Sequence, residues 1–414
     1  MESNKKLTEL NKMMSKQIEA MLAKLRACAS SNGDERFVDV IEDEVEVGEK
    51  KIHDGDETGI VIEDSMRFDG CSERRKAAGG NLGVTRLMFD PYEKLVYDYI
   101  GGMEDLKKAK VRTVTRAYTS FQEDCARILR AVRITARLGF TLSKETSISI
   151  RDLSGLVLGL DKGRLLMEMN YMLAFGSAEA SLRLLWKFGL LEMLLPIQAA
   201  YFVSQGFRRR DKRSNMLLSL FSNLDRLLAP DRPCESSLWV GILVFHKAVV
   251  DYPRDPLVVA TFTLAVHNGG DLDEAVSIAR KISRPHDSSF HELLMPRNLD
   301  LDEVLINEVM DLATSVQDAL SMMTDKTFVS QAMAEYSQAP YSDLVFIPVY
   351  LYASVRNIFG CVRRGKENKV FRKQGTKINY KHLGLGNLQE VRHTFARVVF
   401  DTVYPLHLEQ QHTP

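Results

Sequence analysis

The sequence lacks any uninterrupted apolar run long enough to cross a membrane. A membrane-spanning helix needs roughly 20 apolar residues, and the most apolar stretch, 237–250, is interrupted by His246 and Lys247. The amino terminus also lacks the apolar segment of a secretory signal and the Arg-rich, acid-poor composition of an organellar transit peptide. We therefore expect an intracellular protein with no membrane partner. The sequence does not distinguish a nuclear, cytoplasmic or organellar location.

Cysteine is scarce, and its arrangement argues against two kinds of structural site. The five cysteines are scattered, odd in number and without CxxC spacing. A disulfide framework or a zinc site is not expected from such a pattern. The nine histidines are dispersed too, and His286 and His291 form no recognisable ligand pair. We predict no metal site from local sequence.

What the chain does contain is a segregated charge. The 414 residues carry 55 basic and 55 acidic side chains, and 45% of them are apolar, as in soluble globular proteins. Residues 34–64 hold 13 acidic and 3 basic residues, a net charge of −10. The rest of the chain, with 52 basic and 42 acidic residues, has a net charge of +10. A folded part with this basic excess suits a polyanionic partner.

The first 80 residues and the following 40 have different patterns. In segment 1–30, apolar residues of 7–25 recur at helical spacing, which predicts an amphipathic helix that packs on its own protein or pairs with a second copy. The acidic segment 31–80 has the composition of a disordered linker. Beyond it, 87–91 and 94–99 resemble two short strands around a turn, followed by a short helix at 103–110 and an extended piece at 111–114.

From Ser120 onward the pattern is helical, so the fold class we predict is mainly α. Ser120 is placed to cap a helix that runs to Arg137, with Gly139 just beyond its end. Asp161 is placed to cap a helix through Phe175, and Ser177 to cap the next one, before Gly189. Further apolar periodicity recurs at 214–228, 237–250, 256–267, 271–282, 302–322, 326–335 and 343–359.

The helix expected at 121–138 has a polar face that suggests chemistry. At about 100° per residue, its carboxylates and arginines share one arc, and Ile128, Leu129, Val132 and Ala136 lie opposite. Such an arc is usually a solvated face with ion pairs one turn apart. The functional interpretation is that Asp124 accepts and Arg127 donates hydrogen bonds along one edge. That pair is able to read the Watson–Crick edge of a nucleobase.

Three segments resemble one known family in the expected order and spacing. The run FQEDCARILRAVRITARLGF (121–140) resembles the neck helix of class II tRNA nucleotidyltransferases and bacterial-type poly(A) polymerases. The preceding LMFDPYEKLVYDYIGGMEDLKKAKVRTV (87–114) resembles the last strands of that family's head domain and their link to the neck. DKGRLLMEM (161–169) resembles the next family motif. The resemblance is clear over about 87–230 and extends to about 360 as a helical body.

The resemblance implies a domain organisation and a set of site residues. It implies a head remnant at 81–118, a neck at 119–200, a helical body at 201–360 and a basic RNA-binding tail at 361–414. The residues implied to bind the nucleotide are Glu123, Asp124, Arg127 and Arg130. Those implied to form the hinge and the brace of the neck helix are Asp98, Asp105, Arg164 and Glu168.

The family's catalytic carboxylates are not found in the sequence. Complete members add AMP, or CCA, to RNA 3′ ends with ATP (or CTP) and Mg²⁺. In those members a D-x-D strand motif binds the Mg²⁺, and a preceding G-G-x-V-R-D segment binds the phosphates of the nucleotide. Asp54–Gly55–Asp56 is formally D-x-D, but its acidic, polar surroundings do not predict a strand. The glycines of 78–83 lack the Arg-Asp that should follow them. We therefore assign no catalytic and no metal-binding residue, and expect a truncated, catalytically impaired chain.

Clusters of basic residues predict an RNA-binding surface. Lys and Arg supply salt-dependent contacts to phosphates, and neighbouring aromatic rings stack on single-stranded bases. The residues predicted to bind RNA are Arg208, Arg209, Arg210, Lys212, Arg213, Arg363, Arg364, Arg372 and Lys373; a further basic stretch runs through 107–116. The leading hypothesis is an RNA-binding family member. The alternatives are an active polynucleotide adenylyltransferase and a non-catalytic regulatory protein that pairs through 7–25. CCA addition and polyadenylation are not distinguished.

Overall fold

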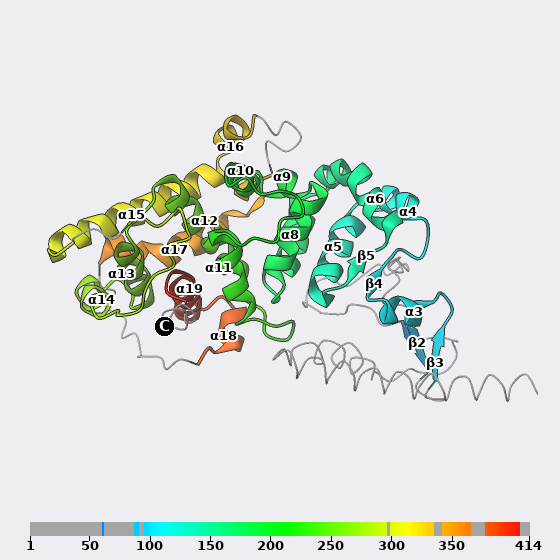
Figure 1. Ribbon diagram of the computed structural model, residues 1–414, viewed down its shortest axis with the longest axis horizontal. Helices are drawn as coiled ribbons and strands as arrows, with labels where there is room; N and C mark the ends of the chain where they lie inside the picture. The colour runs from blue at the N-terminus through cyan, green and yellow to red at the C-terminus, as the bar shows by residue number, and fades with distance from the viewer. Residues whose placement is uncertain are drawn as a thin grey trace, which may run out of the picture. The chain divides into compact units, whose positions relative to one another are not determined.

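The computed structural model describes residues 60–61, 87–90, 95–295, 299–334, 342–365 and 377–405, which form two compact units. The first unit extends to Leu153 and the second begins at Ser154. Within the described part the fold is mainly α, as predicted, with two small sheets (Figure 1). The predictions for 7–25, Asp54–Asp56, 78–83, Arg372 and Lys373 lie outside the described residues.

The first unit begins with a small antiparallel sheet. Strands β2 (Leu87–Asp90) and β3 (Leu95–Asp98) pair as predicted, with Leu87 opposite Asp98. A third strand, β1 (Ile60–Val61), pairs with the other edge of β2. These two residues lie inside the segment predicted to be a disordered linker, so that prediction is wrong for them. Their pairing partners are more than 25 residues away in sequence and leave no local signal.

A parallel crossover follows the sheet. Helix α3 (Gly102–Lys107) leads to β4 (Lys110–Val111), and β4 pairs in parallel with β5 (Thr141–Leu142). Between these strands run α4 (Ala117–Glu123) and α5 (Ala126–Leu138), and α6 (Lys144–Leu153) follows β5 and packs against α4. Gly139 ends α5 with a φ of 63°, the left-handed conformation expected of it.

The single helix predicted from Ser120 to Arg137 is wrong, because the chain breaks at Asp124. Asp124 has φ −148° and ψ 101°, and its carboxylate accepts a hydrogen bond from the Ala126 N–H at 3.1 Å. Ser120 is fully buried inside α4 rather than at a helix start. The predicted core face of α5 is confirmed, since Ile128, Leu129 and Val132 are fully buried. No glycine or proline marks the break in the sequence.

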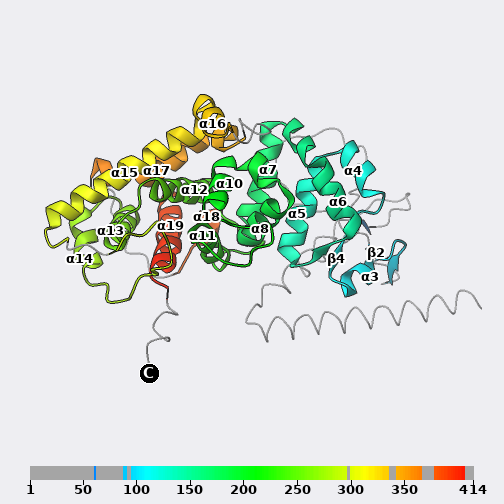
Figure 2. The ribbon, with the colours of Figure 1, turned by 45° about the horizontal axis from the view of Figure 1, so that its top comes forward.

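The second unit opens with a group of short helices. It contains η2 (Ser154–Gly159), α7 (Lys162–Leu173), α8 (Ala178–Phe188), α9 (Leu191–Leu194), α10 (Pro196–Ser204) and α11 (Met216–Asp225). Figure 2 shows α8, α10 and α11 grouped together, and α8 packs against α11. Asp161 caps α7 as predicted, accepting from the Arg164 N–H at 2.9 Å. Helix α7 ends at Leu173, two residues earlier than expected.

The remainder of the second unit is a layered helical body. Its elements are α12 (Ser236–Asp251), α13 (Pro256–His267), α14 (Leu272–Ala279), α15 (Asp302–Thr324), α16 (Lys326–Ala332), η3 (Leu344–Phe346), α17 (Val349–Arg364), α18 (Tyr380–Gly384) and α19 (Leu388–Val403). The long α15 packs on α12, α13 and α17 (Figure 1). No helix in the described part is long and apolar enough to span a bilayer.

The core of this body is aromatic and includes the carboxyl-terminal helix. The ring centroid of Phe395 on α19 lies 5.5 Å from that of Phe245 and 5.1 Å from that of Phe359. Arg392, also on α19, is fully buried, and its guanidinium donates to the carbonyls of Ile358 and Asn357. Part of the segment expected to be a basic tail is therefore the packed core of the body.

Candidate nucleotide-binding and RNA-binding sites

Arg127 is held in place by the end of the helix before its own. Its Nη1 donates to the carbonyl of Ser120 at 3.0 Å, to the Ser120 Oγ at 3.1 Å and to the Glu123 Oε2 at 3.0 Å. Three acceptors on one nitrogen restrict the guanidinium to one orientation. Glu123 is one of the residues implied to bind the nucleotide, and that role stays a prediction. The part played by Ser120 had no signal in the sequence.

Asp124 stands beside this guanidinium. Its Oδ2 lies 3.9 Å from the Arg127 Nε, while its Oδ1 accepts from the first turn of α5. Both side chains are partly exposed, 30% for Asp124 and 19% for Arg127. The structure therefore brings the predicted carboxylate and guanidinium together at the helix junction. A planar acceptor next to a planar donor is the chemistry needed to read a nucleobase edge.

Arg130 and Glu123 lie on either side of this pair. Arg130 is half-buried one turn further along α5, and its side chain has no hydrogen bond or ion pair to the described residues. Glu123 is 58% exposed. Arg133, by contrast, is only 4% exposed. Arg133 is therefore buried, although the helical projection places it on the polar arc.

Asp98 closes the turn between β3 and α3. Its carboxylate accepts hydrogen bonds from the backbone N–H groups of Gly101 and Gly102, both at 2.8 Å, and also from those of Ile100 and Met103. Partial burial alone would raise the pKa of this carboxyl. The four backbone donors outweigh burial and lower the pKa below its ordinary value.

Asp105 fixes the other side of the same turn. Its side chain is 8% exposed, and its Oδ2 lies 2.6 Å from the Arg112 Nε. Arg112 also donates to the carbonyl of Ile100 and crowds Gly101, whose φ of 81° favours glycine. Asp98 and Asp105 thus organise one short helical turn, which is the position expected of the hinge. The hinge motion itself stays a prediction.

The two residues predicted to brace the neck helix lie in the second unit. Arg164 is exposed on the first turn of α7, and Glu168 is buried one turn further on, at 6% exposure. Asp124 and Arg127 belong to the first unit. The bracing role of Arg164 and Glu168 stays a prediction.

The basic loop, residues 206–213 between α10 and α11, has two arginines engaged within the protein. Arg209 Nη1 donates to the carbonyl of Trp186 at 2.7 Å, and Arg209 also forms an ion pair with Glu192. Arg213 forms an ion pair with Asp211 at 2.7 Å. Hydrogen bonding to Arg213 holds the pKa of the Asp211 carboxyl well below its usual range.

The other three basic residues of this loop face solvent. Arg208, Arg210 and Lys212 are exposed, and their side chains have no ion pair or hydrogen bond within the part of the chain that is described. Arg363 and Arg364 are also exposed, at the end of α17, where Arg363 Nη1 donates to the Gln317 Oε1 at 2.6 Å. Within the basic loop, Arg209 and Arg213 are therefore paired with carboxylates, whereas Arg208, Arg210 and Lys212 have no carboxylate partner among the described residues.

The described residues contain no ligand set for the metal that the family resemblance implies. No three His, Cys, Asp or Glu side chains among them come together as metal ligands.

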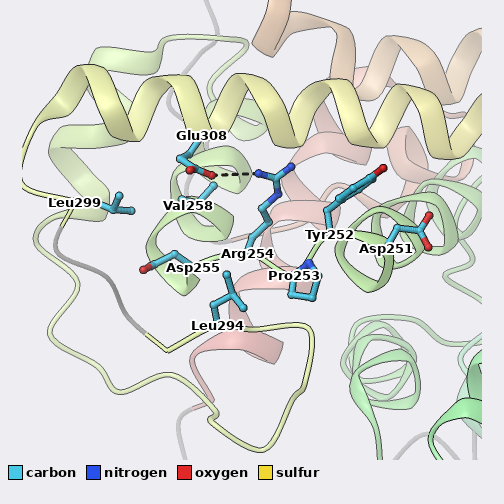
Figure 3. A pocket seen from close by; sticks show the side chains of 9 residues that line it. All are labelled: Asp251, Tyr252, Pro253, Arg254, Asp255, Val258, Leu294, Leu299 and Glu308. Atoms are coloured by element: carbon cyan, nitrogen blue, oxygen red, sulfur yellow. Dashed lines mark hydrogen bonds and ion pairs between the residues drawn. The ribbon is translucent and has the colours of Figure 1, made fainter.

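A separate pocket of ≈ 300 Å³ lies at the connection between α12 and α13 (Figure 3). The Arg254 Nη1 lies 3.1 Å from the Glu308 Oε2 on α15, and the Tyr252 side chain at the rim is 60% exposed. None of the predicted site residues lines this pocket. Its one arginine is already paired across it, so the pocket adds no group to the candidate sites.

Comparisons with known proteins confirm the family resemblance. Residues 139–202 match a family model described as the probable RNA- and SrmB-binding site of polymerase A. The chain is 35% identical over 147 residues to poly(A) polymerase I of Haemophilus influenzae, which is 36% of this chain and 32% of that protein. It is 37% identical over 99 residues to the CCA-adding enzyme of Bacillus subtilis, covering 24% and 25%. The chain thus spans about a third of the length of the curated poly(A) polymerases it matches.

A solved structure gives a weaker likeness. The CCA-adding enzyme of Bacillus stearothermophilus in complex with CTP is 19% identical, with 70% of this chain and 69% of that chain covered at a TM-score of 0.32. A TM-score this low does not establish a common overall arrangement.

Proposed function

We propose that this chain is an RNA-binding member of the tRNA nucleotidyltransferase/poly(A) polymerase family, whose described part binds RNA and presents a nucleobase-reading pair without a complete catalytic centre. The observation that carries the proposal is the match of residues 139–202 to the family's probable RNA-binding site. That match ends four residues before the basic loop. Clusters of Lys and Arg bind phosphates and release counterions, which makes binding strong at low salt.

The partner we propose is the 3′ end of an RNA, either a tRNA or an mRNA. Arg208, Arg210 and Lys212 are exposed and available for phosphates, whereas Arg209 and Arg213 have carboxylate partners. Arg363 and Arg364, exposed at the end of α17, are proposed as a second contact. We also propose an intracellular location. Finally, we propose self-association through residues 7–25, which is tested by comparing the sedimentation of the full chain with that of a chain lacking 7–25.

RNA binding is tested with a matched pair of triple variants. Arg208→Ala, Arg210→Ala and Lys212→Ala together are expected to weaken binding of a tRNA lacking its CCA end. The dependence of log affinity on log salt should become shallower by about 2 to 3, because each of the three phosphate contacts contributes about 0.7 in a single strand and about 0.9 in a duplex. The control is Lys144→Ala, Lys281→Ala and Lys326→Ala, three exposed lysines elsewhere.

The control removes the same charge and should retain most of the affinity and the slope. Equal losses in both triple variants would indicate that only net charge matters, which would contradict a specific surface. If the unmodified protein binds no RNA at low salt, the proposed function is wrong.

A second candidate function, an active adenylyltransferase, is favoured by the geometry of Asp124 and Arg127. Two partly exposed side chains 3.9 Å apart, one of them fixed by Ser120 and Glu123, are suited to select ATP or CTP by its base. In complete family members bound Mg²⁺ activates the RNA 3′-OH and stabilises the leaving pyrophosphate. In this chain Asp124 and Arg127 would orient the base.

The two functions are separated by incubating the protein with ATP, Mg²⁺ and an RNA lacking its 3′ CCA. Extension of the RNA that Asp124→Ala abolishes would establish the active enzyme and reject the impaired one. RNA binding without extension is the outcome expected of the leading proposal. Arg127→Lys is the companion variant, because lysine keeps the charge but loses the planar donor edge.

A further inference from the structure

Two guanidinium groups of the basic loop lie over aromatic rings. The Cζ of Arg209 is 4.0 Å from the ring centroid of Trp186, and the Cζ of Arg213 is 5.1 Å from that of Phe207. The aromatic residues are buried, but the arginine side chains remain 47% and 61% exposed. Each arginine therefore has an aromatic ring on one side and substantial surface open to solvent.

The edges of these guanidinium groups already have partners. Arg209 donates to the Trp186 carbonyl at 2.7 Å and forms an ion pair with Glu192. Arg213 donates to the Asp211 Oδ2 through both Nε and Nη2, at 2.9 and 2.7 Å, and to the Gly206 carbonyl at 3.1 Å. An arginine binds a phosphate by donating two hydrogen bonds from the N–H groups along one edge of its guanidinium. These two edges are occupied, so the outward face is the surface left for a ligand.

Side chains of α8 hold the backbone of the basic loop in place, which fixes the positions of Arg209 and Arg213 before a ligand binds. Arg183 on α8 donates to the carbonyls of Asp211 and Arg213, at 3.2 and 3.0 Å. The Trp186 Nε1 donates to the Arg208 carbonyl at 3.1 Å. Within the loop, the ring centroid of Phe207 lies 5.2 Å from that of Phe202 on α10. A surface held by its own hydrogen bonds loses little conformational entropy when a ligand binds.

The stacked and the available side chains are interleaved along the loop. Arg209 and Arg213 are stacked and charge-paired, whereas Arg208, Arg210 and Lys212 are exposed without partners among the described residues. Flat stacking faces beside free cations are the two elements of single-stranded nucleic-acid binding, because bases stack on planar groups while cations follow the backbone. In a duplex the bases are paired and stacked and are not available to such a face.

We infer that the basic loop is a docking platform for single-stranded RNA, on which bases stack against the outer faces of Arg209 and Arg213 while phosphates contact Arg208, Arg210 and Lys212. This inference rests on the proposed RNA-binding function and names the class of RNA that this surface takes. Stacking on a guanidinium tolerates any base, so the platform would accept a 3′ strand of varied sequence.

The test distinguishes the contribution of the planar guanidinium groups of Arg209 and Arg213 from that of their positive charge. The double variant Arg209→Lys/Arg213→Lys keeps both charges and removes both planes. Its affinity for oligo(A) should fall on the order of tenfold for each stacked base lost. Its affinity for an abasic oligoribonucleotide of equal length should stay unchanged, because that probe has phosphates but no bases. The double variant Arg210→Ala/Lys212→Ala should weaken both probes alike and make the salt dependence shallower.

A second readout covers the case in which the lysine variant distorts the loop. The chain has two tryptophans, and Trp239 is fully buried. In a Trp239→Phe protein, the emission of Trp186 should change when oligo(A) is added and should not change with the abasic strand. A hairpin RNA of equal charge should bind this loop more weakly than oligo(A).

Three results would overturn the inference while leaving RNA binding intact. They are an equal loss for oligo(A) and the abasic strand in the lysine variant, no loss for either, or tighter binding of the hairpin. Absence of any RNA binding by the unmodified protein would instead reject the proposed function on which the inference rests.

Discussion

At the scale of single residues, the guanidinium of Arg127 is oriented by acceptors in the preceding helix α4. Asp124 and Arg127 are adjacent, as their spacing predicts. The acceptors that orient Arg127 include the carbonyl and the hydroxyl of Ser120, seven residues earlier. The break between the two helices at Asp124 changes which side chains of α4 reach Arg127. Spacing along one helix therefore predicts that Asp124 and Arg127 meet, but it does not predict the hydrogen bonds from Arg127 to Ser120.

Asp98 gives a residue-scale prediction about pH. Its folded pKa lies below the value of 3.8 for an ordinary carboxyl, because four backbone N–H groups stabilise the charged form. The stability it contributes is therefore present above pH 3.8 and is lost as the pH falls through the lowered pKa. Asp98→Asn should cost about 1 kcal/mol at pH 7, and the difference from the unmodified protein should shrink at pH 3. Urea unfolding at both pH values measures this.

Glu104→Gln is the control for Asp98. Its carboxylate pairs with Lys108 at the surface, where both side chains are largely exposed. Exposed ion pairs of this kind contribute little to stability, so this variant should unfold almost as the unmodified protein does. A cost of Asp98→Asn that is the same at pH 3 and pH 7 would contradict the explanation based on charge.

At the scale of elements, helix ends marked by glycine or by a local cap follow from sequence, and ends capped from a distance do not. Asp161 caps α7, and Gly189 ends α8 with a φ of 75°, both as predicted. Ser177 precedes α8 but makes no side-chain cap. The carboxylate of Asp225, at the end of α11, instead accepts from the N–H groups of Ala178 and Glu179 at 2.8 and 2.9 Å. The predicted cap at Ser177 is therefore wrong.

This exchange of caps gives an element-scale prediction. Asp225→Ala should destabilise the second unit by about 1–2 kcal/mol, because two N–H groups at the start of α8 lose a charged acceptor. Ser177→Ala is the matched control and should be close to neutral. Thermal unfolding of both variants measures the effect. A larger loss from Ser177→Ala than from Asp225→Ala would restore the interpretation made from the sequence.

At the scale of the whole molecule, one buried carboxylate links distant parts of the second unit. Asp343 is fully buried and accepts from the Ile197 N–H at 3.0 Å and from the Leu344 N–H at 2.7 Å. It thereby ties the start of α10 to η3, 146 residues later. Burial raises the pKa of Asp343 to about 7, although the two backbone donors oppose that shift.

The raised pKa of Asp343 predicts a stability that falls with rising pH. Between the unfolded value near 3.8 and the folded value of about 7, the folded protein holds a proton that the unfolded chain has lost. The penalty for burying the charge is complete above pH 7. In Asp343→Asn this dependence disappears. The free energy of unfolding of the variant, relative to that of the unmodified protein, should therefore rise by a few kcal/mol as the pH is raised from 4 to 8. Denaturant unfolding at several pH values measures the difference.

At pH 4 the asparagine variant should be the less stable protein, because its side chain offers one oxygen where the carboxyl offers two. A constant difference across this pH range would show that Asp343 titrates normally and that its burial carries no charge penalty.

The sequence by itself determined the mainly helical class, the family resemblance, the pair Asp124–Arg127 and helices such as α13, whose bounds of 256 and 267 match the prediction. These features follow from spacing within one turn or one helix, which residue order records directly. Only the tertiary structure decided the break at Asp124, the cap supplied by Asp225, the burial of Arg392 and the stacking of Arg209 on Trp186. Each depends on packing or on partners beyond the next turn of helix, and a hydrogen bond or a buried ring is set by distance in space, not by distance along the chain.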